Sequence, residues 1–137
     1  MATRVLDSWA LMAYLEDEPA AEEVERMLVQ AESGKHKLLL CAVNWGEIYY
    51  AIMRVTSQDT AEEKMREIAG MAIEVMPVSE DLHLVRQAAI YKARHKLAYA
   101  DCFAAALAHI RKAELVTGDE EFKAVEKDLK GILWLHR

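Results

Sequence analysis

The chain has 137 residues, of which 53% are hydrophobic and 29% are charged, and its formal net charge is −6. This size and composition are typical of one globular domain and exclude a disordered or fibrous chain. No apolar run approaches the roughly 20 residues of a membrane span, and no basic region with a cleavage site opens the chain. We therefore expect a single domain over residues 1–137, located in the cytoplasm and without a membrane partner.

Short apolar runs rich in leucine or β-branched residues alternate with longer stretches of helical period. The strands are predicted at Thr3–Leu6, Lys37–Cys41, Ile73–Met76, Glu114–Thr117 and Ile132–Leu135. The helices are predicted at Ser8–Leu15, Ala21–Glu32, Trp45–Val55, Asp59–Gly70, Glu80–His95, Tyr99–Lys112 and Glu120–Leu129, with Ser79 as the N-cap of the fifth. Strands separated by helices imply right-handed crossovers, so the fold class is α/β: a three-layer α/β/α sandwich with a mostly parallel sheet of about five strands.

Four acidic residues stand out from this pattern. Asp101 is the only formal charge in the most apolar helical stretch, residues 98–110, and a carboxylate buried there without a partner would cost several kcal/mol. Asp7 and Asp119 follow predicted strands, and Glu47 lies near the start of a predicted helix, as does Asp101. Because ligands bind outside the carboxyl ends of parallel strands, we expect these four carboxylates to converge there.

Each acid also has a purely structural interpretation. Asp7 and Asp119 are good N-caps, Glu47 fits a capping box with Asn44, and Asp101 is favoured near a helix N-terminus by the helix dipole. Capping does not require convergence, however, whereas binding of Mg²⁺ or Mn²⁺ through carboxylate oxygens does. Two such ions would change the formal charge from −6 to −2, so the negative charge does not exclude a nucleic-acid partner.

The cysteines and the predicted helix Trp45–Val55 carry further expectations. Cys41 and Cys102 lie in apolar segments without metal-ligand spacing, so we expect buried free thiols. One stripe of the helix is predicted to be core: Trp45, Ile48, Tyr49, Ile52 and Val55.

With these residues in place, the chain resembles the PIN-domain nucleases, and among them the VapC-type toxins of toxin–antitoxin pairs. The resemblance covers nearly the whole chain and rests on four short motifs in order. They are Val5-Leu-Asp-Ser-Trp-Ala10, Asn44-Trp-Gly-Glu-Ile48, Tyr99-Ala-Asp-Cys-Phe103 and Thr117-Gly-Asp-Glu-Glu-Phe122. One departure is Cys41, where many relatives carry a serine or threonine.

The resemblance implies a single PIN-like nuclease domain and a cofactor, Mg²⁺ or Mn²⁺. Asp7, Glu47, Asp101 and Asp119 would be the catalytic metal ligands. Ser8 and Thr117 would be hydroxyls that orient them, and Glu121 an additional acid. The implied activity is that of an endoribonuclease, with RNA as substrate, which cleaves phosphodiester bonds with metal-activated water and leaves a 5′-phosphate and a 3′-hydroxyl. A toxin of this family would form a homodimer and be inhibited by a cognate antitoxin protein.

Two surface groups are candidates for binding partners. Lys92, Arg94 and Lys96 form the densest basic cluster, which either stabilises a helix C-terminus or positions RNA phosphates. Tyr50, Met53 and Arg54 project away from the predicted core stripe. They are either partly buried or part of a dimer or antitoxin interface, where aromatic and methionine side chains are enriched.

Two functional alternatives stay open at this point. One is a housekeeping RNA-processing or structure-specific nuclease, which would use the same acids. The other is a PIN-like module that binds RNA or protein without cutting it. Four converging acids argue against the second alternative, because a module that only binds has no need of them.

Overall fold

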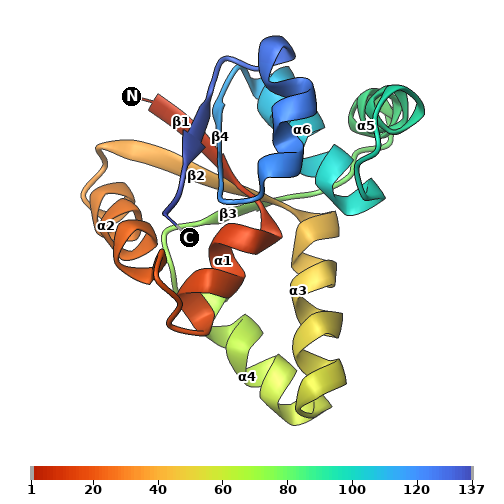
Figure 1. Ribbon diagram of the computed structural model, residues 1–137. Coiled ribbons are helices and arrows are strands. Elements are labelled where there is room, and N and C mark those ends of the chain that lie inside the picture. Colours follow the sequence, from red (N-terminus) through yellow and green to blue (C-terminus); the bar gives the residue numbers. More distant parts are fainter. Residues whose placement is uncertain (1, 137) are drawn as a thin grey trace.

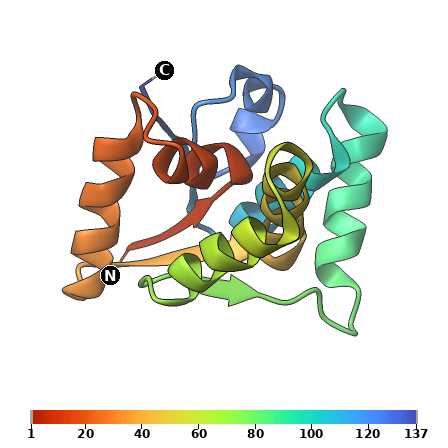
Figure 2. The same ribbon diagram turned by 90° about the horizontal axis from the view of Figure 1, so that it is seen from below.

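The computed structural model describes residues 2–136, which form a five-stranded sheet with helices on both faces (Figures 1 and 2). The strands are β1 (Ala2–Leu6), β2 (His36–Cys41), β3 (Glu74–Met76), β4 (Glu114–Thr117) and β5 (Ile132–Trp134). The α-helices are α1 (Ser8–Leu15), α2 (Ala21–Glu32), α3 (Ala42–Val55), α4 (Gln58–Ala69), α5 (His83–Arg94) and α6 (Tyr99–Arg111). A 3₁₀ helix, η1 (Glu120–Asp128), joins β4 to β5.

The sheet is parallel throughout, in the strand order β3-β2-β1-β4-β5. The central strand β1 lies between β2 and β4, and its last residue, Leu6, is in register with Leu40 and Val116. The three central strands therefore end at the same level, and the segments that follow them meet at one edge. The predicted fold class, an α/β sandwich with a five-stranded parallel sheet, is confirmed.

The core has two halves because neighbouring strand residues point to opposite faces of the sheet. Val5, Leu39 and Leu115 pack beneath α5, α6 and η1. Leu6 and Leu40 pack on the other face, against α1 to α4. This burial on both faces explains why the central strands read as continuous apolar runs rather than as alternating ones.

Helix α6 positions much of the site because its face toward the sheet is made largely of small residues. Ala104, Ala105, Ala106 and Ala108 are fully buried, which lets the helix axis approach β1, β2 and β4 closely. The same packing fixes the first turn of α6 at the carboxyl edge of the sheet. Cys41 and Cys102 are buried free thiols in this half of the core, as expected.

Several predicted boundaries were wrong for identifiable reasons. Helix α3 begins at Ala42 rather than Trp45, directly after Cys41, which ends β2 in an extended conformation. Helix α5 begins at His83 rather than Glu80, and Ser79 is not its N-cap. The Ser79 hydroxyl donates instead to the Asp81 carboxylate, which accepts the backbone N–H of His83 at 3.0 Å.

Two further predictions about helices also failed. The segment after β4 is a 3₁₀ helix, although its apolar residues Phe122 and Val125 are buried as a helical pattern requires. Val55 was assigned to the core stripe of α3 but is 77% exposed, because it is the last residue of the helix and lies beyond the packed part. Ile48 and Ile52 are buried, while Trp45 and Tyr49 are partly buried against the same core.

Candidate metal centre

Five acidic side chains reach the carboxyl edge of the sheet from four different parts of the fold. Asp7 follows β1, Glu47 lies in the second turn of α3, and Asp101 lies in the first turn of α6. Asp119 is the N-cap of η1, and Glu121 is in its first turn. The sequence places these residues up to 114 positions apart, and the parallel topology brings them to one place.

Asp7 forms the buried floor of the site, with only 1% of its surface exposed. One carboxylate oxygen accepts the backbone N–H of Ala10 at 2.9 Å, and the other accepts the hydroxyl of Thr117 at 2.5 Å. The pKa of Asp7 is raised to about 7, mainly by burial: the two hydrogen bonds lower it, and the charges of Asp101 and Asp119 contribute to the rise. Asp7 is thus an N-cap, as its structural interpretation required, and also belongs to a group of interacting acids.

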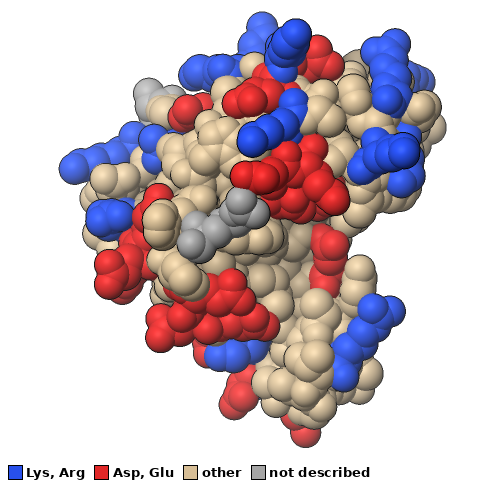
Figure 3. All heavy atoms as spheres, in the orientation of Figure 1, with Lys and Arg blue, Asp and Glu red and all other residues tan. Residues whose placement is uncertain are grey.

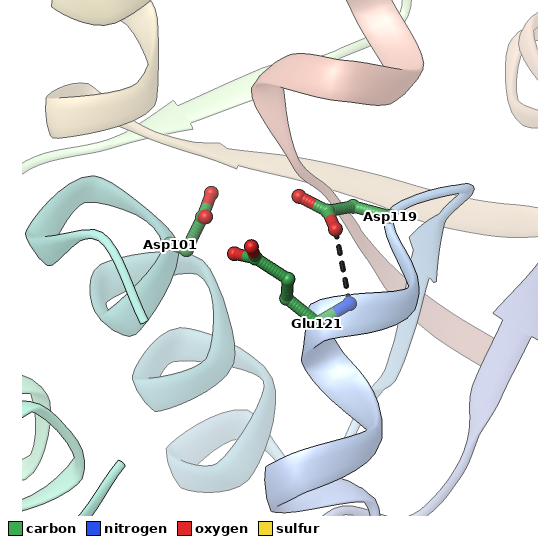
Figure 4. Close-up of side chains that lie close together, drawn as sticks. All are labelled: Asp101, Asp119 and Glu121. Atoms are coloured by element: carbon green, nitrogen blue, oxygen red, sulfur yellow. Dashed lines mark hydrogen bonds between the residues drawn. The ribbon is translucent and has the colours of Figure 1, made fainter. Parts of the chain in front are cut away.

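Asp101, Asp119 and Glu121 form the open part of the site (Figure 4). Each offers a carboxylate oxygen, and these oxygens all lie within 4.8 Å of one another. Asp119 is also a cap, since it accepts the backbone N–H of Glu121 at 3.0 Å. Burial raises the pKa of Asp101 to about 7, and the neighbouring charges of Glu47, Asp119 and Glu121 add to the effect.

Glu47 is held in place by α1 rather than by its own helix. The hydroxyl of Ser8 donates a short hydrogen bond to the Glu47 carboxylate. The predicted capping box between Asn44 and Glu47 is therefore wrong, because α3 begins before Asn44 and Asn44 is not its N-cap. Glu47 nevertheless lines the same groove as Asp101 and Asp119, and its charge contributes to the raised pKa of Asp101.

Asn44 was not assigned a site role from the sequence, yet it links three of the elements that carry the acids. Its side chain is fully buried, and its amide nitrogen donates to the carbonyl of Ala100 at 3.0 Å and lies 3.5 Å from the hydroxyl of Ser8. Its amide oxygen has no hydrogen-bond partner among the described residues. A signal was available in the sequence: an amide in an otherwise apolar helical start, three residues before Glu47.

Thr117 connects the two strands that bear Asp7 and Asp119. Its hydroxyl donates to Asp7 and accepts the backbone N–H of Asp119 at 3.0 Å. Because Thr117 is fully buried, one fixed hydroxyl orients the Asp7 carboxylate and holds the backbone at Asp119. The structure therefore places Ser8 and Thr117 as hydrogen-bond donors to acids of the group, Glu47 and Asp7 respectively.

A groove of about 300 Å³ opens beside the acids and is lined on its apolar side by Trp9, Met12 and Ala51. Gly118 sets the position of the Trp9 ring: a Cβ atom at Gly118 would lie 2.2 Å from the ring atom Cη2. No other residue fits this position without displacing the indole. No pattern in the sequence indicates this contact, because it joins residues 109 positions apart.

The acidic group lacks the partners that would neutralise it. Among the ion pairs formed by residues 2–136, none involves Asp7, Glu47, Asp101, Asp119 or Glu121. Figure 3 shows acidic side chains gathered on this face of the molecule. Clustered carboxylates with raised pKa values and no basic partner are suited to a divalent cation, since a bound ion would replace mutual repulsion by attraction.

The predicted partner-binding residues lie outside this group. Lys92 donates from its ammonium group to the carbonyl of Leu97 at 2.7 Å, so it also secures the turn between α5 and α6, whereas Arg94 and Lys96 are exposed. Tyr50 and Met53 are 48% and 44% exposed on α3, and the Arg54 guanidinium lies 4.8 Å from the centre of the Tyr50 ring. Within residues 2–136, no helix has the length and apolar character needed to cross a membrane.

Comparison with known proteins identifies related folds. The profile of the PIN domain family matches residues 4–128, whereas no curated protein sequence matches the chain. Among solved structures, VapBC2 from Rickettsia felis, bound to a DNA fragment from its promoter, is similar with a TM-score of 0.73 and 13% identity, covering 98% of this chain and 99% of that one. VapBC-1 from nontypeable Haemophilus influenzae has a TM-score of 0.68 and 19% identity, covering 93% and 95%. VapC20 from Mycobacterium tuberculosis, described as a sarcin–ricin loop cleaving toxin, has a TM-score of 0.68 and 17% identity, covering 89% and 94%.

Proposed function

The chain belongs to the PIN domain family, and from this premise we propose that it is a metal-dependent endoribonuclease, the toxin of a toxin–antitoxin pair. The observation that carries the proposal is the acidic group. Three carboxylates offer oxygens within 4.8 Å of one another, and no described basic residue pairs with them. Family membership makes nuclease chemistry the natural use of such a group.

The proposed ligands of a divalent cation, Mg²⁺ or Mn²⁺, are Asp101, Asp119 and Glu121, with Asp7 and Glu47 completing the acidic surroundings. When bound, such ions would supply positive charge for the scissile phosphate and lower the pKa of a water that attacks it. The protein's part is to fix the carboxylates. Thr117 orients Asp7, and Ser8 orients Glu47.

The same geometry explains why the free protein would not cleave RNA. Five acids around one opening repel a phosphodiester, and the raised pKa values of Asp7 and Asp101 mean that a proton competes with a cation near neutral pH. We therefore propose an activity that depends strictly on the metal and that rises with pH between about 6 and 8.

The partner proposals rest on similar structures and on exposed residues. A further similar structure, from Klebsiella pneumoniae, is a toxin–antitoxin complex by name, so we propose a cognate antitoxin for this chain, and a homodimer as its assembly. Tyr50, Met53 and Arg54 are the proposed contact residues, because they are exposed on α3, the helix that also borders the acidic groove through Ala51. An RNA substrate implies action in the cytoplasm. The proposed contacts to RNA phosphates are Lys92, Arg94 and Lys96, at the C-terminal end of α5 and in the turn before α6.

The direct test is cleavage of a panel of tRNA and rRNA fragments with Mg²⁺, Mn²⁺ or EDTA. Asp7→Asn and Asp101→Asn should each lower the rate by more than about 100-fold, while an exposed control, Glu25→Gln on α2, should not. Both asparagine variants keep the side-chain size, so circular dichroism should show a folded protein. Cleavage that persists in EDTA, or in both asparagine variants, would exclude this function.

A toxin and a housekeeping nuclease would both show this metal-dependent cleavage. The growth of cells that express the protein distinguishes the two. Induced expression of a toxin should arrest growth, and the arrest should be relieved by Asp101→Asn and by co-expression of the neighbouring antitoxin. A housekeeping nuclease should be tolerated. A module that only binds RNA would retain its affinity for RNA in EDTA and yield no cleavage product with either metal.

A further inference from the structure

The two helices α5 and α6 carry a charge opposite to that of the rest of the chain. Residues 83–112 contain six Lys and Arg residues against a single acid, a formal charge of +5 within a chain of −6, which leaves −11 on the other residues. The six basic residues are Arg86, Lys92, Arg94, Lys96, Arg111 and Lys112. Helices α5 and α6 pack side by side, so these charges lie on two neighbouring helices, whose outer surface we call the basic face. Figure 3 shows basic side chains on the α5 side of the molecule.

A cleft of about 440 Å³ lies between α5 and the C-terminal end of α6. Its polar lining consists of Arg86, Lys112, His83, His109 and Gln87, and no acidic residue lines it. Arg86 and Lys112 are exposed and form no ion pair within residues 2–136. The cleft lies at the N-terminal end of α5 and at the C-terminal end of α6, where the two helix dipoles oppose each other, so its positive charge comes from its side chains.

Lys112 occupies a backbone position that a lysine does not favour. It is the C-cap of α6 with φ +52°, in the left-handed region where glycine is preferred. A lysine there costs roughly 1 kcal/mol relative to glycine. From this position Lys112 lines the same cleft as Arg86, so two positive charges face one opening.

Two acids lie near the cleft without lining it. Asp81, which precedes α5 and interacts electrostatically with His83 and Arg86, accepts the backbone N–H of His83. Asp128 contributes its backbone carbonyl to the Nδ1 atom of His109 at 2.9 Å. Neither carboxylate lines the cleft, so the charge inside it is that of Arg86 and Lys112.

We propose that this cleft binds a backbone phosphate of the RNA strand, at a distance from the point of cleavage. The inference rests on the proposed function, because it supplies the same substrate with a second contact. Lys112 lies eleven residues after Asp101, which corresponds to roughly 16 Å along the α6 axis. A single strand several nucleotides long spans that distance along the basic face, with Lys96 and Arg94 near one end and the cleft at the other.

The test compares two double variants with the same change in charge. Arg86→Gln with Lys112→Gln removes the cleft charges, whereas Arg26→Gln with Lys64→Gln removes an arginine and a lysine from α2 and α4. Both are made in the Asp101→Asn background, so that a fluorescent 20-nucleotide single-stranded RNA stays intact. Binding is measured by fluorescence anisotropy in Mg²⁺ at several salt concentrations.

The cleft variant should bind the RNA at least fivefold more weakly than the control variant. The slope of log affinity against log salt concentration should fall by about 0.7, because the cleft holds one phosphate and each phosphate contact on a single strand contributes about that amount. A four-nucleotide RNA, too short to reach the cleft, should bind both variants equally. Equal affinities and equal slopes for the 20-nucleotide RNA would overturn the cleft proposal.

A single variant separates loss of binding from damage to the fold. Lys112→Gly removes the same charge but relieves the backbone strain, so it should keep or raise the melting temperature while weakening RNA binding. Unchanged RNA affinity in Lys112→Gly would also count against the cleft. If the wild-type chain cleaves RNA but these variants do not change the affinity for RNA, the cleft proposal is overturned and the proposed function stands. If the wild-type chain neither binds nor cleaves RNA, the proposed function is overturned as well.

Discussion

Replacing Asp7 by asparagine should stabilise the metal-free protein at alkaline pH while abolishing its activity. The carboxylate is fully buried, and its pKa of about 7 stands well above its ordinary value of 3.8. This difference corresponds to a cost of about 4 kcal/mol for ionising Asp7 in the folded protein rather than in the unfolded one. Asparagine avoids the cost because it carries no charge at any pH.

The sign of the pH dependence follows from proton uptake. Between pH 3.8 and 7 the folded protein holds a proton on Asp7 that the unfolded chain has released, so folding takes up a proton and stability falls as the pH rises. Between pH 5 and pH 8 the loss due to Asp7 is roughly 2.5 kcal/mol. Asp7→Asn does not show this decrease in the free energy of unfolding. Its stability relative to the wild type should therefore increase by the same amount between pH 5 and pH 8.

Urea denaturation in EDTA at pH 5 and pH 8 measures this gain. Comparing the two pH values cancels the pH-independent cost of the altered hydrogen bond to Thr117, since asparagine has an N–H where Asp7 has an acceptor oxygen. The control Glu25→Gln, exposed on α2, should show no such gain. If Asp7→Asn destabilises the protein equally at both pH values, the carboxylate is not under electrostatic stress and the reasoning fails.

Three further predictions concern the metal, the groove and the buried amide. Mn²⁺ at about 100 times its dissociation constant should stabilise the wild type by about 2.7 kcal/mol, which corresponds to a rise in melting temperature of roughly 5 to 10 °C. Differential scanning fluorimetry measures this rise, and Asp101→Asn should abolish most of it. Gly118→Ala should cost roughly 1 to 3 kcal/mol in chemical denaturation because its Cβ would collide with the Trp9 ring, and Trp9→Leu should recover part of the loss. Asn44→Ala should lower stability by about 1 to 3 kcal/mol, since it leaves the Ala100 carbonyl without its donor, and should weaken Mn²⁺ binding measured by calorimetry.

The layered fold could be predicted from the sequence because its signals are local. Helices α1 and α2 have the predicted bounds: α2 shows a clear helical period over its whole length, and α1 directly follows its N-cap residue, Asp7. The predictions failed where a tertiary contact decides the local structure. Helix α5 begins late because Asp81, not Ser79, engages the amide of His83, and the segment after Asp119 forms a 3₁₀ helix rather than an α-helix.

The candidate site was predictable in part for a related reason. In a parallel sheet, residues that follow neighbouring strands meet, so the positions of Asp7 and Asp119 in the sequence already imply their proximity. The roles of Asn44, Trp9 and Gly118 depend on side chains that meet across 36 to 109 positions, and no periodic pattern marks such contacts.

The most direct test of the acidic group as a metal centre is calorimetric titration of the metal-free protein with Mn²⁺ at pH 6.5 in two buffers of different ionisation enthalpy. Because Asp7 and Asp101 have pKa values of about 7, both hold protons at this pH for most of the time. Saturable binding that releases roughly one to two protons per protein is expected, and the release should nearly vanish at pH 8.5. Absence of Mn²⁺ binding, or binding without proton release at pH 6.5, would contradict a metal centre built on these carboxylates.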